Sequence, residues 1–232
     1  LVGADGMHST VRERAGIAFA GGSYAESFVL ADVRLTGGVA HDEVTLYFSP
    51  AGLVVVAPLP GGAHRVVATV DAAPEHPALA DIQALLDARG PERERARVRE
   101  LIWGSRFHVH HRVAERYRER RVLLAGDAAH VHSPAGGQGM NTGVQDAVAL
   151  ADALAAALAG AGEAPLDAWS AARRPVALEV VALADRLTRL ATLSQWLRPL
   201  RNALLWSVAR SPAFRRRLTW QLSGLAWRPS NA

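Results

Sequence analysis

The sequence contains no cysteine and no lysine. The absence of cysteine excludes disulfide bonds, zinc–thiolate sites and thiol catalysis. All 26 basic residues are arginine, so a Walker-type phosphate loop, which requires a lysine, is also excluded. No uninterrupted apolar run approaches the roughly 20 residues that a bilayer span needs, and we therefore expect no membrane span.

Acidic residues are missing from the last fifth of the chain. Residues 1–185 carry 17 arginines and 22 acidic residues, a net charge of −5, whereas residues 186–232 carry nine arginines and no acid. A basic segment can bind nucleic acid, a membrane surface or an acidic partner. Because arginine replaces lysine throughout the chain, the bias is more typical of the source composition, and we expect no nucleic-acid partner.

The start of the chain has none of the features of a secretory signal. It reads Leu-Val-Gly-Ala-Asp-Gly, without a basic start or a cleavage region, so we expect a cytoplasmic location. The 232 residues suffice for one large domain or two small ones. Half of them are hydrophobic and 21% are charged, which is typical of a globular protein.

The middle of the chain has the pattern of an antiparallel meander. β-branched and aromatic runs alternate with glycine and proline turns. We expect strands over residues 28–35, 44–48, 53–58 and 65–70, and another near 105–112. Between them, a helix is predicted over 77–88, ended by Gly90, and a charged helical stretch over 91–102.

Helices dominate the two ends of the chain. Near the start, Thr10 and Glu13 have the spacing of a capping box. A strand over 121–125 leads through a loop over 128–137 into a long helix over 139–158. The apolar residues of that helix predict one buried stripe, formed by Val144, Val148, Ala151, Leu154 and Leu158. From residue 166 onward the pattern is helical, with breaks predicted at Pro175, Pro199 and Pro212, and Arg173 and Arg174 as a solvated helix start.

A carboxylate and a glycine-rich loop follow the strand over 121–125. Asp127 comes at its carboxyl end, where α/β sheets bind ligands, and suits a sugar or polyol hydroxyl. Glycines 136, 137 and 139 let backbone amides come close to a ligand. The unpaired amides of the helix start favour an anion or an electron-rich carbonyl. This order of elements predicts a ligand cradle.

Two segments resemble motifs of the class A flavoprotein monooxygenases, the p-hydroxybenzoate hydroxylase-like family of FAD-dependent aromatic hydroxylases. Gly126-Asp127-Ala-Ala-His130, then Pro134, then Gly137-Gln-Gly-Met-Asn141 resemble the second FAD motif. Gly3-Ala-Asp5-Gly6-Met-His-Ser9-Thr-Val-Arg12 resembles the Asp-Gly motif. Both occur in the family's order, with the β-rich region between them. His111-Arg112-Val-Ala-Glu-Arg-Tyr117 is similar to the bacterial phenolic and polyketide hydroxylase branch.

The resemblance implies a mixed α/β (α+β) fold. A partial Rossmann-like FAD-binding domain would comprise residues 1–20, with the Asp-Gly motif, and 113–160, with the Gly-Asp motif. Residues 21–112 would form an antiparallel β-sheet substrate domain, and 161–232 a helical C-terminal region. The family begins with a strand–Gly-x-Gly-x-x-Gly–helix that holds the ADP half of FAD. This segment is missing from the sequence, so we interpret the chain as N-terminally truncated.

The activity implied by the resemblance is hydroxylation of an aromatic or polyketide-like substrate by O2. FAD would be the cofactor, NAD(P)H the reductant, and a flavin hydroperoxide the hydroxylating species. Asp127, with Gly126, would bind the ribityl or ribose hydroxyls, and Pro134 would lie near the reactive edge of the flavin. Backbone amides would face its pyrimidine end from Gly137, Gln138, Gly139, Met140 and Asn141. Asp5 and Arg12 would lie near the pyrophosphate and the nicotinamide nucleotide. No catalytic acid or base is assigned, and no metal is expected.

Two other functions stay open. Without the first FAD motif, the chain could be a non-catalytic FAD-binding remnant or a partner-binding fragment. The histidine clusters could instead converge with Asp127 in a metal-dependent hydrolase, through His108, His110, His130 and His132. Against this, proline and glycines follow the second pair rather than further ligands.

Tryptophans interleave with leucines and arginines in the last 40 residues. They are Trp196, Trp206, Trp220 and Trp227. A basic and aromatic segment could lie on a membrane surface. We expect it instead to pack on the parent domain or on a second subunit, which would make a homodimer.

Overall fold

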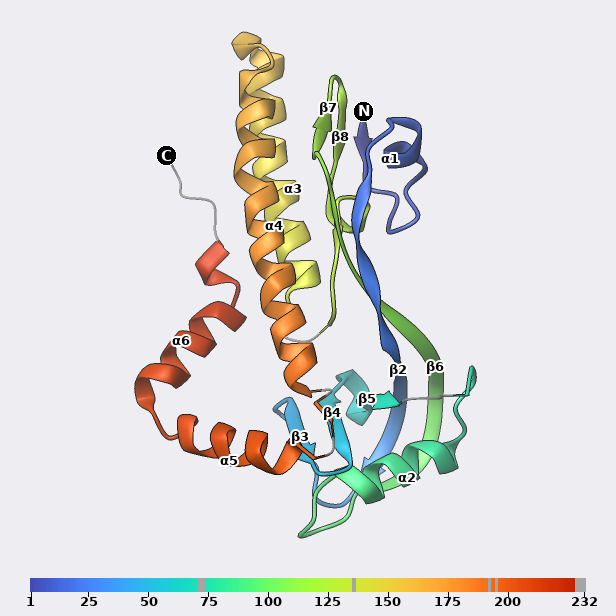
Figure 1. Ribbon diagram of the computed structural model, residues 1–232. Helices are drawn as coiled ribbons and strands as arrows, with labels where there is room; N and C mark the ends of the chain where they lie inside the picture. Colours follow the sequence, from blue (N-terminus) through green and yellow to red (C-terminus); the bar gives the residue numbers. More distant parts are fainter. Residues whose placement is uncertain (71–73, 135–136, 192, 195, 228–232) are drawn as a thin grey trace. The chain divides into compact units, whose positions relative to one another are not determined.

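A computed structural model describes residues 1–70, 74–134, 137–191, 193–194 and 196–227 (Figure 1). The chain forms two compact units. The first comprises Leu1–Ser23, His110–Thr188 and Ala209–Ala232, and the second Tyr24–Val109 and Arg189–Val208. The C-terminal stretch that we expected to be one helical region is therefore divided between the two units.

A small sheet brings distant segments of the first unit together. Its strand order is β1-β8-β7, with β1 spanning Val2–Gly3, β8 Val122–Leu124 and β7 Arg118–Glu119. β1 and β8 are parallel, with Gly3 opposite Leu124, and β7 is antiparallel to β8. Because parallel strands end at the same edge, the residues that follow β1 and β8 leave the sheet side by side.

Helix α1 (Thr10–Arg14) follows β1. Its N-cap is Ser9, whose Oγ accepts a hydrogen bond from the Arg12 N–H at 3.0 Å. The predicted capping box of Thr10 and Glu13 is wrong, because the serine one residue earlier provides the side-chain acceptor of the cap.

Helices α3 (Gly139–Ala156) and α4 (Ala164–Ala191) lie side by side in the first unit (Figure 1). A π-helical turn, η3 (Ala157–Ala161), continues α3. The residues that α3 buries are Thr142, Asp146, Leu150 and Ala153. The predicted apolar stripe is wrong except at Leu154, which is partly buried against the core, because the buried face is centred on a paired carboxylate. Val144, Val148 and Leu158 are 57%, 58% and 87% exposed.

Proline 175 does not break α4, contrary to the prediction. A proline removes one backbone donor from a helix, but residues on both sides of it are anchored in the core, among them Trp169 and Ala177. Pro199 and Pro212 lie in the first turns of α5 (Arg198–Val208) and α6 (Pro212–Leu222), where a missing N–H is tolerated. A 3-10 turn, η4 (Leu225–Trp227), ends the described chain.

One helical segment in the described part, Gly139–Ala161, is long and apolar enough by length and composition to cross a membrane. The expectation of no membrane span rests on the lack of a long uninterrupted apolar run, and this criterion does not test it, because the segment contains Asp146 and Asp152. Core helices pass the same test, and this one contributes Leu150 and Ala153 to the core of the first unit and buries the paired Asp146.

The second unit is built on an antiparallel sheet. β3 (Thr45–Ser49), β4 (Gly52–Pro58), β5 (His64–Val70) and β2 (Phe19–Thr36) pair antiparallel in that order, followed by β6 (Arg97–Ala114). The predicted antiparallel strands are thus confirmed, and β3, β4 and β5 form a meander, but β2 pairs with β5 rather than with β3, its neighbour in sequence. The charged helix predicted over 91–102 is wrong throughout: residues 91–96 form bends without a helix, and from Arg97 onward buried Val98 alternates with exposed arginines, the period of a strand. The far end of β6 lies in the first unit, where Val113 pairs with His130 of β9 (His130–Val131).

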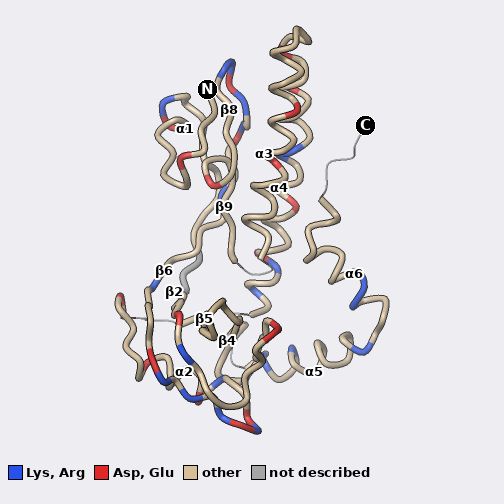
Figure 2. The backbone as a smooth tube through the Cα atoms, turned by 180° about the vertical axis from the view of Figure 1, so that it is seen from behind, with Lys and Arg blue, Asp and Glu red and all other residues tan. Residues whose placement is uncertain are grey.

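Helices complete the second unit. α2 (Leu79–Arg89) buries Ile82 and Leu86 in the same core as the sheet residues Val54 and Val66. In α5, the Asn202 Nδ2 donates to the Phe48 carbonyl at 3.1 Å. The basic C-terminal segment carries arginine and no acid (Figure 2).

Three tryptophans of that segment are largely exposed rather than packed on the parent domain, while packing on a second subunit stays a prediction. Trp196, Trp206 and Trp220 are 85%, 62% and 55% exposed. The hydrogen bonds that hold α5 and the end of α6 run instead through polar side chains to backbone carbonyls.

Candidate cofactor site

The Gly-Asp motif forms a turn at the end of β8. The chain passes through Ala125 into η2 (Gly126–Ala128), and Gly126 has a φ of +61°, a conformation that favours glycine. Asp127 is exposed and makes no hydrogen bond or ion pair within the described residues. Its carboxylate is therefore open to a ligand.

The glycine loop is open on its outer side. Pro134 and Gly137 are exposed, and the Gly137 N–H donates to the Pro134 carbonyl at 2.9 Å. Gly137 has a φ of +64°, and a Cβ added there would meet no atom within 4 Å. Gly136, which the sequence also predicts to line the cradle, lies outside the described residues.

The start of α3 has no side-chain cap. Gln138 precedes the helix, but its Nε2 donates to the Leu222 carbonyl at 2.6 Å. The first helical amides, those of Gly139, Met140 and Asn141, have no acceptor within the helix. Met140 is 80% exposed and Asn141 is also exposed, so these donors and the positive end of the helix dipole face outward.

The helix start lies against the Gly-Asp turn. A Cβ added to Gly143, in the first turns of α3, would be 3.5 Å from the Cα of Gly126. The open carboxylate of Asp127 and the open amides of α3 therefore belong to one site.

The Asp-Gly motif reaches the same sheet edge, two residues after β1. The Asp5 Oδ1 accepts a hydrogen bond from the Ser9 Oγ at 2.5 Å, and Oδ2 accepts one from the Val11 N–H at 3.1 Å. These two bonds, that of Ser9 first, lower the pKa of Asp5. The Asp5 carboxylate is therefore charged, and in this form it holds the start of α1.

Arg12 ties the two motifs together. Its side chain is 5% exposed, and its guanidinium donates from Nη1 to the Ala128 carbonyl at 3.0 Å and from Nη2 to the Met7 carbonyl at 2.9 Å. It also lies 3.9 Å above the centre of the Phe19 ring. Burial lowers the pKa of Arg12. The predicted contact of Arg12 with the cofactor stays a prediction, whereas its bonds to both loops are in place.

A buried charge network lies behind the loop, and sequence reasoning missed it. Asp146 is fully buried, with its Oδ2 2.8 Å from the His130 Nε2 and its Oδ1 2.5 Å from the Arg173 Nε. His130 and Arg173 are 2% and 4% exposed. The expectation of a solvated Arg173 is wrong, because the guanidinium compensates a carboxylate 27 positions away. No local pattern in the sequence could have revealed this network, because the two partners of Asp146 lie in β9 and α4.

Aromatic rings surround this network. The Tyr117 ring stacks on His130 with centroids 6.1 Å apart, and the Trp169 Nε1 donates to the Asp146 carbonyl at 3.1 Å. Burial, followed by the charge of Asp146, raises the pKa of Tyr117. The phenol is therefore protonated and neutral.

His132 stacks on His130, with ring centroids 6.5 Å apart and an interplanar angle of 7°. Its Nδ1 lies 2.8 Å from the Ser133 carbonyl, and its buried Nε2 has no partner in the described part of the chain. Burial lowers the pKa of His132. The ring is therefore neutral at pH 7, with Nδ1 as the donor.

The histidines do not gather as a metal hydrolase would require. Among the described residues, no group of three or more His, Asp or Glu side chains is placed to hold a metal ion. His130 is paired with Asp146, while His108 lies 3.4 Å from the Ser27 hydroxyl.

The open groups of the site suit FAD. A carboxylate accepts hydrogen bonds from ribityl or ribose hydroxyls, and amides at a helix start donate to carbonyl oxygens and stabilise negative charge. Both lie beside glycines whose missing side chains leave open space. Such an arrangement at the carboxyl edge of parallel strands defines a nucleotide-cofactor-binding α/β domain.

The chain belongs to the FAD binding domain family, whose sequence profile matches residues 1–184. It is 42% identical over 198 residues to a flavin-dependent monooxygenase of Mycobacteroides abscessus, covering 81% of this chain and 40% of that protein. It is 41% identical over 205 residues to 6-methylpretetramide 4-monooxygenase of Streptomyces rimosus, covering 86% of this chain and 36% of that protein. The chain thus spans about two fifths of the length of these relatives.

The solved structure of the Diels-Alderase PyrE3, from the biosynthetic pathway of pyrroindomycins, has a similar fold. The TM-score is 0.79 with 32% identity, over 97% of this chain and 49% of that one. These matches confirm the family and the mixed α/β fold that the two motifs predicted.

Proposed function

We propose that this chain forms the flavin-holding part of an FAD-dependent monooxygenase that hydroxylates an aromatic or polyketide-like compound, using NAD(P)H and O2. The observation that carries the proposal is the approach of the uncapped start of α3 to the Gly-Asp turn, with Gly143 against Gly126. The names of two relatives, a flavin-dependent monooxygenase and a 6-methylpretetramide 4-monooxygenase, support the reaction class.

The residues of the site would act by binding and orienting. Asp127 would accept hydrogen bonds from cofactor hydroxyls, and the amides of Gly139, Met140 and Asn141 would donate to the pyrimidine oxygens. Since these donors are fixed in advance at a helix start, they favour added negative charge at little reorganisation cost. When bound, FAD supplies the redox chemistry between the reductant and O2. Behind the loop, Asp146 and its partners keep this geometry in place.

FAD titration, followed by quenching of flavin fluorescence, tests the site. Asp127→Asn removes a charged acceptor, and hydrogen bonds to charged groups contribute about 1.5–3 kcal/mol. We therefore expect the Kd for FAD to rise roughly 10- to 100-fold. The matched control is Asp152→Asn, at an exposed position of α3, which leaves the Kd unchanged. Equal affinity of Asp127→Asn and the parent would reject the site.

A second candidate function is ring closure without net oxidation. It is favoured by the likeness to a Diels-Alderase, at a TM-score of 0.79. A cyclase would form product without consuming NAD(P)H or O2, whereas a monooxygenase oxidises NAD(P)H, which is followed at 340 nm, and takes up O2 when an aromatic polyketide is added. FAD binding with neither activity would indicate a non-catalytic, partner-binding protein.

A further inference from the structure

The residues that follow α6 are held by side chains of the first two long helices. We name residues 222–227 the C-terminal turn. Each of three donors reaches one of its backbone carbonyls. The bonds are Gln138 Nε2 to Leu222 O at 2.6 Å, Gln145 Nε2 to Gly224 O at 3.1 Å and Arg173 Nη1 to Trp227 O at 3.0 Å. All of these residues lie in the first unit.

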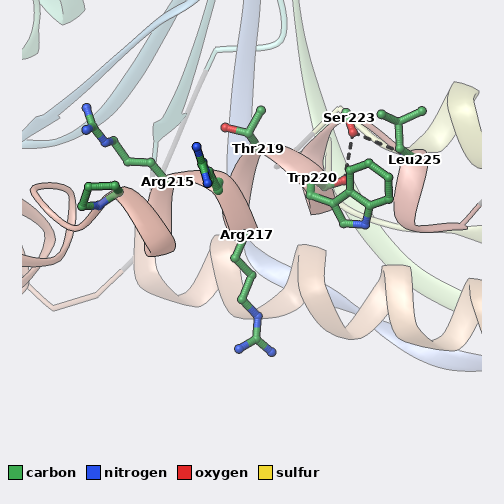
Figure 3. A pocket seen from close by; sticks show the side chains of 8 residues that line it. Arg215, Arg217, Thr219, Trp220, Ser223 and Leu225 are labelled. Carbon is green, nitrogen blue, oxygen red and sulfur yellow. Dashed lines mark hydrogen bonds between the residues drawn. The ribbon is translucent and has the colours of Figure 1, made fainter.

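The C-terminal turn is stabilised by its own hydrogen bonds. The Ser223 Oγ donates to the Trp220 carbonyl at 2.9 Å and accepts from the Leu225 N–H at 3.3 Å (Figure 3). The Ser223 N–H donates to the Thr219 carbonyl at 2.8 Å. These bonds reverse the chain at the end of α6, so that the Leu222 carbonyl accepts from Gln138 and the Gly224 carbonyl accepts from Gln145 as well as from the Trp227 N–H at 3.2 Å.

Gly224 packs on the start of α3. It is buried and has a φ of +73°, and a Cβ added there would come to 3.5 Å from the Gln145 Nε2 and 3.6 Å from the Gln138 Oε1. The same Cβ would be 3.8 Å from the Cβ of Asn141. The C-terminal turn therefore packs against Asn141, whose backbone amide is open, and against Gln138, which directly precedes the open amides.

Gln138 connects this turn to the glycine loop. It is 1% exposed, and it lies between Gly137 and the first helical residue, Gly139. Its own carbonyl accepts from both the N–H and the Oγ of Thr142, each at 2.9 Å. Since its side-chain amide is directed to the C-terminal turn, it orients the helix start without covering the amides.

We propose that Gln138 and Gln145 are positioning residues, which use the C-terminal turn to hold the glycine loop and the open amides of Gly139, Met140 and Asn141 in place for the isoalloxazine ring. The inference rests on the proposed function and adds a third component, residues 222–227, to the two sequence motifs. Gln138 has the larger effect, because it lies in the loop itself. Gln145 acts two turns further along α3.

Hydrogen–deuterium exchange tests the tie without any ligand. Relative to the parent protein, Gln138→Ala should increase exchange at least several-fold in two peptides, one covering residues 137–145 and the other residues 219–227. Gln138→Glu retains the size of the side chain but removes the donor, so it should behave like Gln138→Ala. The matched control, Gln221→Ala, removes an amide in the same segment that makes no hydrogen bond in the described structure, and should change neither peptide.

FAD binding tests the positioning role. Loss of a buried hydrogen bond typically corresponds to about a tenfold change in an equilibrium constant. We therefore expect about a tenfold rise in the FAD Kd for Gln138→Ala and an altered visible circular dichroism spectrum of the bound flavin. Both should be unchanged in Gln221→Ala.

The outcomes separate the two proposals. Exchange that rises only in residues 137–145 would overturn the tie to the C-terminal turn. If Gln138→Ala increased exchange in both peptides but left the FAD affinity and the dichroism unchanged, the positioning role would be overturned. A parent protein that binds no FAD would overturn the proposed function and the positioning role with it, while the exchange data would still decide the tie.

Discussion

Neutralising Asp146 should destabilise the first unit more than any other single change of charge near the site. Its carboxylate is fully buried and accepts from His130 and Arg173 at 2.8 and 2.5 Å. Asp146→Asn leaves the Arg173 guanidinium, which is 4% exposed, without its counter-charge. Removing one partner of a buried pair costs about 3–5 kcal/mol, and two unit charges 4 Å apart at an effective dielectric constant of 20 interact by about 4 kcal/mol.

Urea unfolding followed by tryptophan fluorescence measures this cost. Trp169 is a suitable local probe, because it is 5% exposed and its Nε1 donates to the Asp146 carbonyl. The same substitution at exposed Asp152 of α3 should change the free energy of unfolding by less than about 0.5 kcal/mol. In the double variant Asp146→Asn, Arg173→Gln the two costs should not add, with a coupling energy of at least roughly 1.5 kcal/mol. A loss below 1 kcal/mol (about the cost of one neutral hydrogen bond) for Asp146→Asn would refute the reasoning.

Three further predictions concern residues that support the loops and the helix start of the site. Gly224→Ala should cost about 1–2 kcal/mol in unfolding free energy, because its φ is +73°, whereas Gly143→Ala, at a helical position, should cost nothing or stabilise. Arg12→Lys should lower the free energy of unfolding in urea by about 1–3 kcal/mol, because a lysine cannot span the two carbonyls that the guanidinium reaches. Arg14→Lys, at an exposed position of the same helix, serves as its control. Equal losses of stability in the two variants would argue against a role for the two hydrogen bonds of Arg12. Since burial lowers the pKa of His132 below 6.5, the unfolded chain takes up its proton first as the pH falls through 6.5, and stability falls with it. His132→Asn should flatten that dependence by up to about 1.4 kcal/mol per pH unit, and an unchanged slope between pH 7.5 and 5.5 would contradict this.

Local patterns in the sequence correctly predicted the type and order of the elements that carry Asp127 and the open amides. The strand before Gly126, the turn and the start of the long helix at Gly139 all lie where expected. These features depend on residues close in sequence: a short apolar run, a glycine that permits positive φ, and an uncapped helix start. The meander β3-β4-β5 was predictable for the same reason, since its strands are joined by short glycine and proline turns, whereas the pairing of β2 with β5 joins strands that are distant in sequence.

The face that α3 buries could not be predicted from periodicity. The apolar residues Val144 and Val148 suggest one face, yet the helix buries Asp146 on another. A carboxylate is buried only where its partners exist, and those partners are a histidine in β9 and an arginine in α4. Neither is close to Asp146 in sequence, so a count of apolar residues along one helix contains no information about them.

The C-terminal turn was missed for a different physical reason. Gln138, Gln145 and Arg173 all reach it through backbone carbonyls, and a carbonyl is present at every residue. The accepting positions therefore have no side-chain signature. The one exception is Gly224, whose positive φ requires glycine, but a single glycine near a helix end is equally typical of an ordinary C-terminal cap.

The distribution of satisfied and open polar groups explains why the site faces one way. Behind the loop, Arg12, Gln138 and the charge network around Asp146 use their donors on carbonyls and a carboxylate of the same unit. In front, the Asp127 carboxylate and the first amides of α3 have no such partners among the described residues. The donors behind the loop that make these bonds stabilise the fold, since a buried polar group that loses its partner costs free energy. The outward carboxylate and amides can gain hydrogen bonds when a ligand binds, so substitutions in front should change ligand affinity with little loss of stability, and those behind should change both.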